Sequence, residues 1–179
     1  MSGKVASFLL TVLSVFLAMN CRADTLTAVQ TISVQLMPNG KLSVPASITL
    51  SSAGASFGDF AGSETIQYRA RTSTSGGGTI TAQASSEFTP AGGPAISNGD
   101  LKYTCGAPTL GTGCTGVQTV RTTSQTPVVQ LPAPSCTGGG GQCSSADPNT
   151  VQLQFQLGND PKFPTGTYTT TLTLTITTP

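Results

Sequence analysis

The chain contains no histidine and no tryptophan, and only 8% of its residues are charged. Without histidine it lacks the commonest general base, the commonest metal ligand and the side chain that titrates near neutral pH. A Ser-His-Asp triad is therefore excluded. The GxSxG pattern at residues 54–58 has no histidine to activate its serine, and no phosphate-binding glycine-rich motif occurs before a helix. These absences predict a protein that is not an enzyme and uses no cofactor.

The seven acidic residues form no motif of their own. A glycosidase needs two carboxylates facing one cleft, whereas these residues are scattered over expected turns and strand ends. Asp147 with Asn149, and Asn159 with Asp160, lack the ligand count of a calcium-binding loop. Both pairs adjoin a proline, and we expect turns stabilised by side-chain to backbone hydrogen bonds. No metal site is predicted.

Charge of one sign is not concentrated anywhere. Eight basic residues balance seven acidic ones, and no basic cluster occurs. A nucleic-acid-binding surface needs such a cluster, so no nucleic-acid partner is expected.

Long hydrophobic runs are missing except at the start, where Lys4 precedes an apolar stretch over residues 5–19. This pattern is typical of a secretory signal peptide, with Cys21 and Ala23 at the −3 and −1 cleavage positions. Acylation of Cys21 is disfavoured by the bulky Asn20 before it. We predict a signal peptide over residues 1–23, a single domain over 24–179 and no membrane span after cleavage. The expected location is the periplasm, the cell surface or the medium.

Four cysteines remain after that cleavage: Cys105, Cys114, Cys136 and Cys143. An even number in an exported chain predicts disulfides. Of the three possible pairings we favour the local one, 105–114 with 136–143, because each pair brackets a glycine-rich loop. A four-cysteine zinc site would need C-x2-4-C spacing, which neither pair shows.

What the chain has in abundance is alternation of apolar residues with Thr, Ser and Gln, which is typical of strands with one buried face. Turn-forming clusters of Gly, Pro, Asn and Asp separate the alternating segments. The pattern predicts an all-β, immunoglobulin-like antiparallel β-sandwich of about seven to nine strands. The absence of tryptophan argues against an antibody-type domain. The expected strands cover residues 26–36, 42–50, 65–72, 79–85, 101–105, 117–122, 128–131, 151–157 and 168–178.

The junction between the first two alternating segments restricts how they connect. A two-residue turn at Asn39 and Gly40 would place the two apolar rows on opposite faces. A three-residue loop over residues 38–40, with Gly40 in the left-handed conformation, keeps Leu36 opposite Leu42. The segments are therefore either a bulged hairpin or two separate strands joined by a tight bend.

Most aromatic residues fall on the apolar faces of expected strands, so we expect core packing. These are Tyr68, Tyr103, Phe155 and Tyr168. Phe57 and Phe60 flank a glycine in a linking segment, where they either anchor the loop or form an exposed carbohydrate platform. We favour the anchor. Arg69 and Arg71 are expected on the solvated outer face of one strand.

Three segments resemble a known family. The chain end, Pro164 to Ile176, resembles the closing strand of spore coat protein U-type domains and related chaperone–usher pilins. The segment from Ile48 to Phe60 resembles their early FG-x-aromatic segment, and the alternating segment from Thr25 to Leu36 is similar to their donor strand. One departure is that residues 42–50 contain no cysteine, where the family usually has one.

The resemblance implies a sandwich that lacks one strand. Its groove would be filled first by a periplasmic chaperone and then by the N-terminal strand of the next subunit, which is β-strand addition. The side chains inserted into the groove would be Leu26, Ile32, Val34 and Leu36. We therefore expect a non-enzymatic, exported structural subunit of a bacterial surface fibre or coat, whose partners are its own copies or a periplasmic chaperone and usher.

The alternative function is a self-contained secreted immunoglobulin-like module that binds carbohydrate or a host surface. In that case residues 26–36 would pair within their own molecule. Phe57, Phe60 or the disulfide loops would then be exposed for binding.

Overall fold

The computed structural model describes residues 30–52, 54, 56–136 and 148–179. Gln35–Pro179 form one compact unit, the β-sandwich, and the described residues 30–34 are not part of it. The expected signal peptide over 1–23, Leu26 and Cys143 lie outside the described residues. No helix long and apolar enough to cross a membrane occurs within the described part of the chain.

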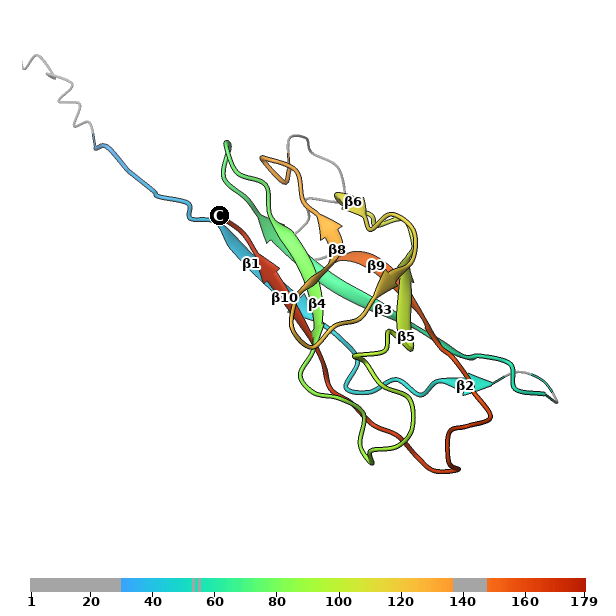
Figure 1. The fold of residues 1–179 in the computed structure, drawn as a ribbon. Helices are drawn as coiled ribbons and strands as arrows, with labels where there is room; N and C mark the ends of the chain where they lie inside the picture. Colours follow the sequence, from blue (N-terminus) through green and yellow to red (C-terminus); the bar gives the residue numbers. More distant parts are fainter. Residues whose placement is uncertain (1–29, 53, 55, 137–147) are drawn as a thin grey trace, which may run out of the picture. The chain divides into compact units, whose positions relative to one another are not determined.

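The described residues form ten strands in two antiparallel sheets, slightly more than the seven to nine predicted (Figure 1). One sheet has the order β1-β3-β9-β5-β7, with β2 also paired to β3, and the other has the order β10-β4-β8-β6. The predicted all-β sandwich is confirmed. The strands are β1 (Asn39–Ser43), β2 (Ser51–Ser52), β3 (Phe60–Arg71), β4 (Thr79–Ala84), β5 (Leu101–Cys105), β6 (Thr112–Gly113), β7 (Gln118–Thr119), β8 (Thr126–Gln130), β9 (Asn149–Leu157) and β10 (Leu172–Thr177).

The core follows from the period-two alternation, because every second side chain of a strand points to the same face. β9 shows this most clearly, with apolar residues buried and the glutamines between them exposed. Tyr103 of β5 packs against Phe155 of β9 with ring centroids 5.9 Å apart. The largest fully buried side chains are Tyr68, Tyr103, Ile66, Ile80, Ile96, Leu131, Leu153, Val120, Val128, Val129 and Val151.

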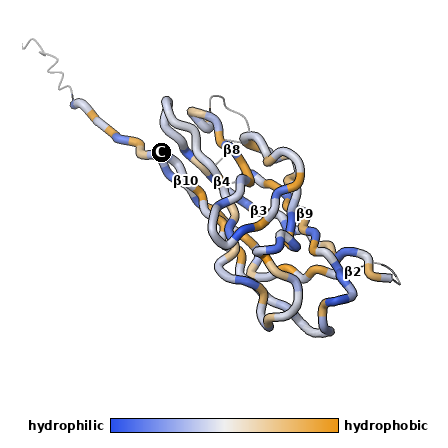
Figure 2. Tube along the Cα trace, viewed as in Figure 1, coloured by the Kyte–Doolittle hydropathy of each residue, from blue (hydrophilic) through white to orange (hydrophobic). Residues whose placement is uncertain are grey.

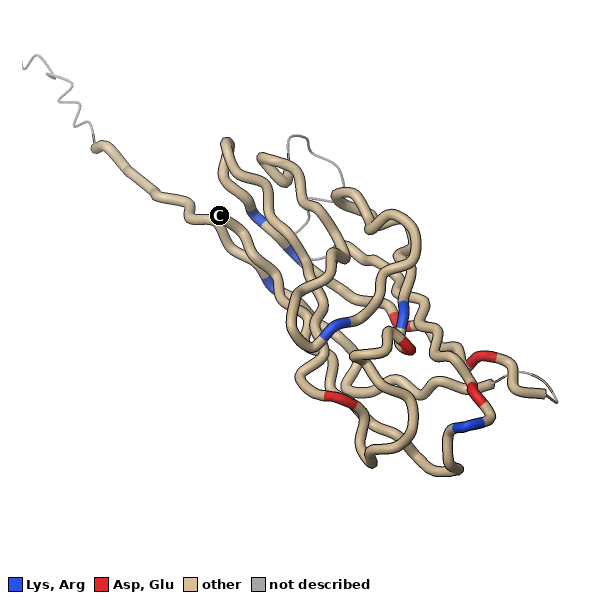
Figure 3. The backbone as a smooth tube through the Cα atoms, viewed as in Figure 1, with Lys and Arg blue, Asp and Glu red and all other residues tan. Residues whose placement is uncertain are grey.

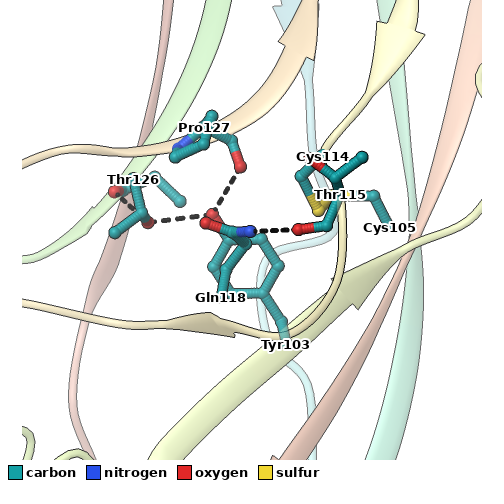
Figure 4. Close-up of a disulfide and its surroundings, with 8 residues drawn as sticks. Tyr103, Cys105, Cys114, Thr115, Gln118, Thr126 and Pro127 are labelled. Carbon is teal, nitrogen blue, oxygen red and sulfur yellow. Dashed lines mark hydrogen bonds between the residues drawn. A yellow bond between two sulfur atoms is a disulfide. The ribbon is translucent and has the colours of Figure 1, made fainter.

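One predicted disulfide is present. Cys105 at the end of β5 is bonded to Cys114, with Cα atoms 5.5 Å apart (Figure 4). Beside it, the Tyr103 hydroxyl donates to the Pro127 carbonyl, and thereby links β5 to β8 of the other sheet. Cys136 is also disulfide-bonded. Because Cys143 lies outside the described residues, the second pairing stays a prediction. A disulfide is typical of an oxidising compartment.

The expected pairing at the N-terminus is wrong. Residues 30–38 have no strand conformation, and β1 begins at Asn39. Gly40 is not in a loop but in the ladder, opposite Ala70 of β3. The strand expected over 42–50 ends at Ser43, because Pro45 has no N–H to continue a ladder.

Two aromatic residues also differ from expectation. Phe57 is 65% exposed and does not anchor its loop, while Phe60 packs partly buried against the core. Tyr168 is only half-buried, and it precedes β10, which begins at Leu172 rather than at residue 168.

Candidate functional site

The last strand, β10, lies at the edge of its sheet, with β4 on one side only. The Ser85 N–H donates to the Thr171 carbonyl at 2.8 Å, so Thr171 directs its carbonyl toward β4. Successive residues of an antiparallel strand direct their main-chain groups to opposite sides. The N–H and C=O groups of Leu172, Leu174 and Ile176 therefore face the free edge, where no strand of the described residues pairs with them.

The inward side chains of this strand remain partly accessible. Leu172, Leu174 and Ile176 are half-buried, whereas their partners Ala84, Ala82 and Ile80 on β4 are buried. An inward-facing residue keeps access to solvent only where the space above it is open. The sandwich is therefore closed over β4 and open along β10.

The facing edge of the other sheet is β1. A Cβ added at Gly40 of β1 would lie 3.1 Å from Cδ1 of Ile176, so the two edge strands lie on the same side of the sandwich (Figure 1). Leu42 of β1 is also half-buried. β1 pairs with β3 only as far as Ser43, opposite Gln67.

The first half of β3 is partly covered by the chain's own residues 48–50. Beyond the end of β1, no ladder joins residues 44–50 to β3, and Ile48 and Leu50 lie over Gly62. On the inner face of β3, Phe60, Gly62 and Glu64 are half-buried, and Ile66 and Tyr68 beyond them are buried. We call the uncovered side of the sandwich between β10 and β1 the open edge.

The order of strands identifies what is absent from the open edge. An immunoglobulin sandwich has the sheets A-B-E-D and C-F-G. Here β1-β3-β9-β5 follow A-B-E-D, and β4 with β10 follow C and F. The position of strand G, beside β10, has no strand among the described residues.

The predicted insertion side chains that the structure describes lie on an exposed segment. Ile32, Val34 and Leu36 are 86%, 81% and 68% exposed. Hydrophobic and hydrophilic residues alternate along this segment (Figure 2). Ile32, Val34 and Leu36 therefore form a row of exposed apolar side chains outside any strand. We call residues 30–36 the N-terminal segment.

One inward-facing charged residue of β3 was missed in the sequence. Glu64 faces inward on β3, in the row that also contains Ile66 and Tyr68. The expected strand began at residue 65, which left Glu64 among the loop charges. Its even spacing from Ile66 was the signal that could have found it. Burial raises the pKa of the Glu64 carboxyl.

Other hollows on the surface offer little chemistry. A hollow of about 470 Å³ on the outer face of β3, β9 and β5 is lined by side chains that include Gln154, Lys102 and the exposed Val117, without an outward aromatic ring. Another, of about 420 Å³, contains Asp160, which is paired with Lys162 at 2.8 Å and accepts from its N–H as a turn residue.

Charged residues are sparse across the described structure (Figure 3). No group of three or more potential metal ligands occurs among the described residues.

Comparison with known proteins adds no relative: no family model matches the chain, and no curated protein or solved structure matches it.

Proposed function

We propose that this protein is a structural subunit of a surface fibre or coat, and that its copies assemble by β-strand addition. The N-terminal segment of one copy fills the open edge of the next. The observation that carries the proposal is the free edge of β10, where inward apolar residues are half-exposed and main-chain groups have no strand partner among the described residues.

The N-terminal segment fits this role by its own pattern. Its apolar side chains alternate with polar ones in the sequence, so in a strand conformation they would all lie on one face, as in a strand inserted into a sandwich. An added strand would bond to the main chain of β10 and cover its half-buried leucines. Burying each large apolar side chain contributes roughly 1.5–3 kcal/mol.

The other function considered, a self-contained binding module, needs the N-terminal segment to pair within its own molecule. Phe57 is exposed, as that function expects, but residues 30–38 contain no strand, and the hollow on the outer face lacks an aromatic platform. Assembly therefore has the better support. Export through a periplasmic chaperone and usher is part of the same proposal, and rests on the family resemblance.

The proposal is tested with two substitutions on opposite faces of the N-terminal segment. Val34→Asp places a charge on the apolar row, and Ser33→Asp places the same charge on the polar row. The purified protein is run unheated on a denaturing gel. We expect a ladder of multimers from the native chain and from Ser33→Asp, and loss of about tenfold or more of the multimers with Val34→Asp. Equal ladders from both variants, or monomer from the native chain, would refute strand addition.

A further inference from the structure

The fold gathers cations at one end of the sandwich, where β1 begins and β3 ends. Lys41 of β1 lies directly opposite Arg69 of β3, and Arg71 follows on the same outer face of β3. Lys41 and Arg71 are exposed, and Arg69 is half-buried. Strand pairing therefore brings together three cations that the sequence separates. We call this the basic end.

The opposite end of the sandwich carries carboxylates. Asp59 comes just before β3, Asp100 comes just before β5, and Asp160 follows β9. The three residues border one hollow together with Lys162. Asp160 is ion-paired with Lys162 at 2.8 Å, and the Asp59 carboxylate accepts from the Gln156 amide at 2.7 Å. Three carboxylates outnumber one lysine here, so we call this the acidic end.

The two ends are too far apart to neutralise each other within one copy. β3 runs from Phe60, beside the acidic end, to Arg71 in the basic end, and its 12 residues span about 36 Å. Charges at that separation are screened in solution, because the Debye length at physiological salt is about 8 Å. In Figure 3 the acidic residues lie away from the C-terminus, which follows β10.

The basic end is also where the N-terminal segment joins the sandwich. Only Met37 and Pro38 separate that segment from β1. The Arg71 Nε donates to the Met37 carbonyl at 2.8 Å. Two extended residues reach about 7 Å at most. A copy whose N-terminal segment is inserted into a neighbour therefore has its basic end against that neighbour.

The direction of the inserted strand decides which end of the neighbour is met. Gly40 lies against Ile176, so β10 finishes at the basic end and begins, at Leu172, toward the acidic end. A segment antiparallel to β10 finishes near Leu172 and brings its own basic end to the neighbour's acidic end. A parallel segment finishes near Ile176 and brings two basic ends together, which is strongly unfavourable.

We propose that the basic end of one copy docks on the acidic end of the next, and that this contact orients the two copies for insertion of the N-terminal segment. The inference rests on the proposed function and names the surface that selects the orientation of the partner copy. Attraction between opposite charges speeds association and weakens with salt. Assembly of the native chain should therefore slow by about tenfold or more from ~0.02 M to ~0.5 M ionic strength.

Two variants of the full chain reverse the charge of one end each. Lys41→Glu with Arg71→Glu leaves Arg69 as the one cation of the basic end against two new carboxylates. Asp59→Lys with Asp160→Asn leaves Asp100 as the one carboxylate of the acidic end against two lysines. Either variant by itself then brings like charges together at each head-to-tail contact.

The two variants are assembled separately and as an equal mixture. Each protein is diluted from denaturant with its disulfides intact, and the multimers are followed over time on unheated gels at low ionic strength. We expect each variant alone to assemble about tenfold or more slowly than the native chain. In the mixture the two reversed ends attract each other, as do the two native ends, so assembly should recover to within about threefold of native.

The mixture is its own control, because mixing does not rescue a variant that misfolds or that lacks the bond from Arg71 to Met37. A mixture that assembles no faster than its components would overturn the inference. If Val34→Asp removes the multimers while the reversed variants assemble at the native rate, strand addition stands and the docking of the ends is wrong. If Val34→Asp leaves the multimers unchanged, strand addition fails and the inference fails with it.

Discussion

Glu64 and Tyr68 lie on the same inner face of β3, yet burial affects them differently. The Tyr68 hydroxyl donates to the Leu110 carbonyl and is fully enclosed by the core. Glu64 is half-buried on the part of β3 beyond the end of β1, and no hydrogen bond to its carboxylate occurs among the described residues. The Tyr68 hydroxyl is therefore hydrogen-bonded within the core, whereas the Glu64 carboxylate is not.

The pH dependence of the monomer's stability should reveal the free-energy cost of burying the Glu64 carboxylate. Its pKa is raised in the folded state, so its contribution favours folding below the unfolded pKa and is lost as the pH rises through the folded value. We expect Glu64→Gln to stabilise the monomer at pH 7 by about 1 kcal/mol or less, and to have no effect near pH 3. Calorimetry in the Val34→Asp background measures this, and an equal effect at both pH values would contradict it.

Tyr68 gives a second prediction, at alkaline pH. Burial raises its pKa to about 12, and the hydrogen bond to Leu110 opposes that shift only in part. The stability that the neutral hydroxyl provides is therefore lost as the pH rises from about 10 to 12. Tyr68→Phe should cost about 1 kcal/mol at pH 7 and lessen the loss of stability above pH 10. Denaturant titrations at pH 7 and pH 11 measure both effects, and a variant as stable as native at pH 7 would count against the bond.

At the scale of the elements, the proposed strand addition depends on β10. Its main-chain groups alternate between bonding to β4 and facing the free edge. Substitutions at neighbouring residues are therefore expected to have different effects. Leu174 directs its N–H to the free edge, and Thr175, opposite Thr81, directs its own to β4.

Proline substitutions test that alternation. Leu174→Pro removes an N–H that only an added strand would use, and edge strands tolerate proline at such positions. We expect a folded monomer with its multimers reduced about tenfold or more relative to Leu174→Ala, which keeps the N–H. Thr175→Pro breaks a bond to β4 and should destabilise the fold by about 3 kcal/mol. Circular dichroism and unheated gels report these results, and normal assembly of Leu174→Pro would argue against main-chain pairing at this edge.

The disulfide between Cys105 and Cys114 stabilises an excursion of the chain between β5 and β8. The bond closes a loop with a sequence separation of 9, and the chain-entropy model assigns such a loop about 2–3 kcal/mol. Replacing both cysteines by serine should lower the free energy of unfolding by that amount, as denaturant titration would show. No change on replacement would mean that the loop is already ordered without the bond.

The sequence predicted the elements that have one buried and one exposed face. The strand expected over 101–105 matches β5, and those over 79–85 and 151–157 match β4 and β9 within two residues. In these strands the alternately buried residues are also the residues that pair in a ladder. The alternation of apolar residues in the sequence therefore predicts both burial and pairing. They diverge at the N-terminus, where Ile48 and Leu50 pack over Gly62 without joining a ladder.

The open edge itself could not be derived from alternation. Which strand lies at the edge of a sheet depends on pairing between distant parts of the chain. The sequence around Leu174 has the same alternation as a strand in the middle of a sheet. Only the family resemblance implied that a strand is missing. Glu64 was missed because the start of β3 at Phe60 is fixed by pairing with Leu157, far away in the sequence.

At the scale of the whole molecule, the sandwich combines a low charge with an uncovered edge. Natural sheets usually protect an edge with charges, prolines or bulges, because a bare edge recruits other strands. β10 instead presents threonines on its outer face and half-buried leucines on its inner face, with no charged residue from Leu172 to Thr177. An edge of this kind is a hazard in a monomer and an advantage in a subunit that assembles.

Amide hydrogen exchange along β10 is the measurement that tests the central claim most directly. In the monomeric Val34→Asp variant, the amides of Leu172, Leu174 and Ile176 should exchange rapidly, and those of Thr173 and Thr175 slowly, because only the latter are bonded to β4. In the assembled native protein, all five should exchange slowly, with about a hundredfold slowing or more at the three edge positions. Edge amides that exchange equally fast in monomer and assembly would contradict the claim that β10 receives a strand.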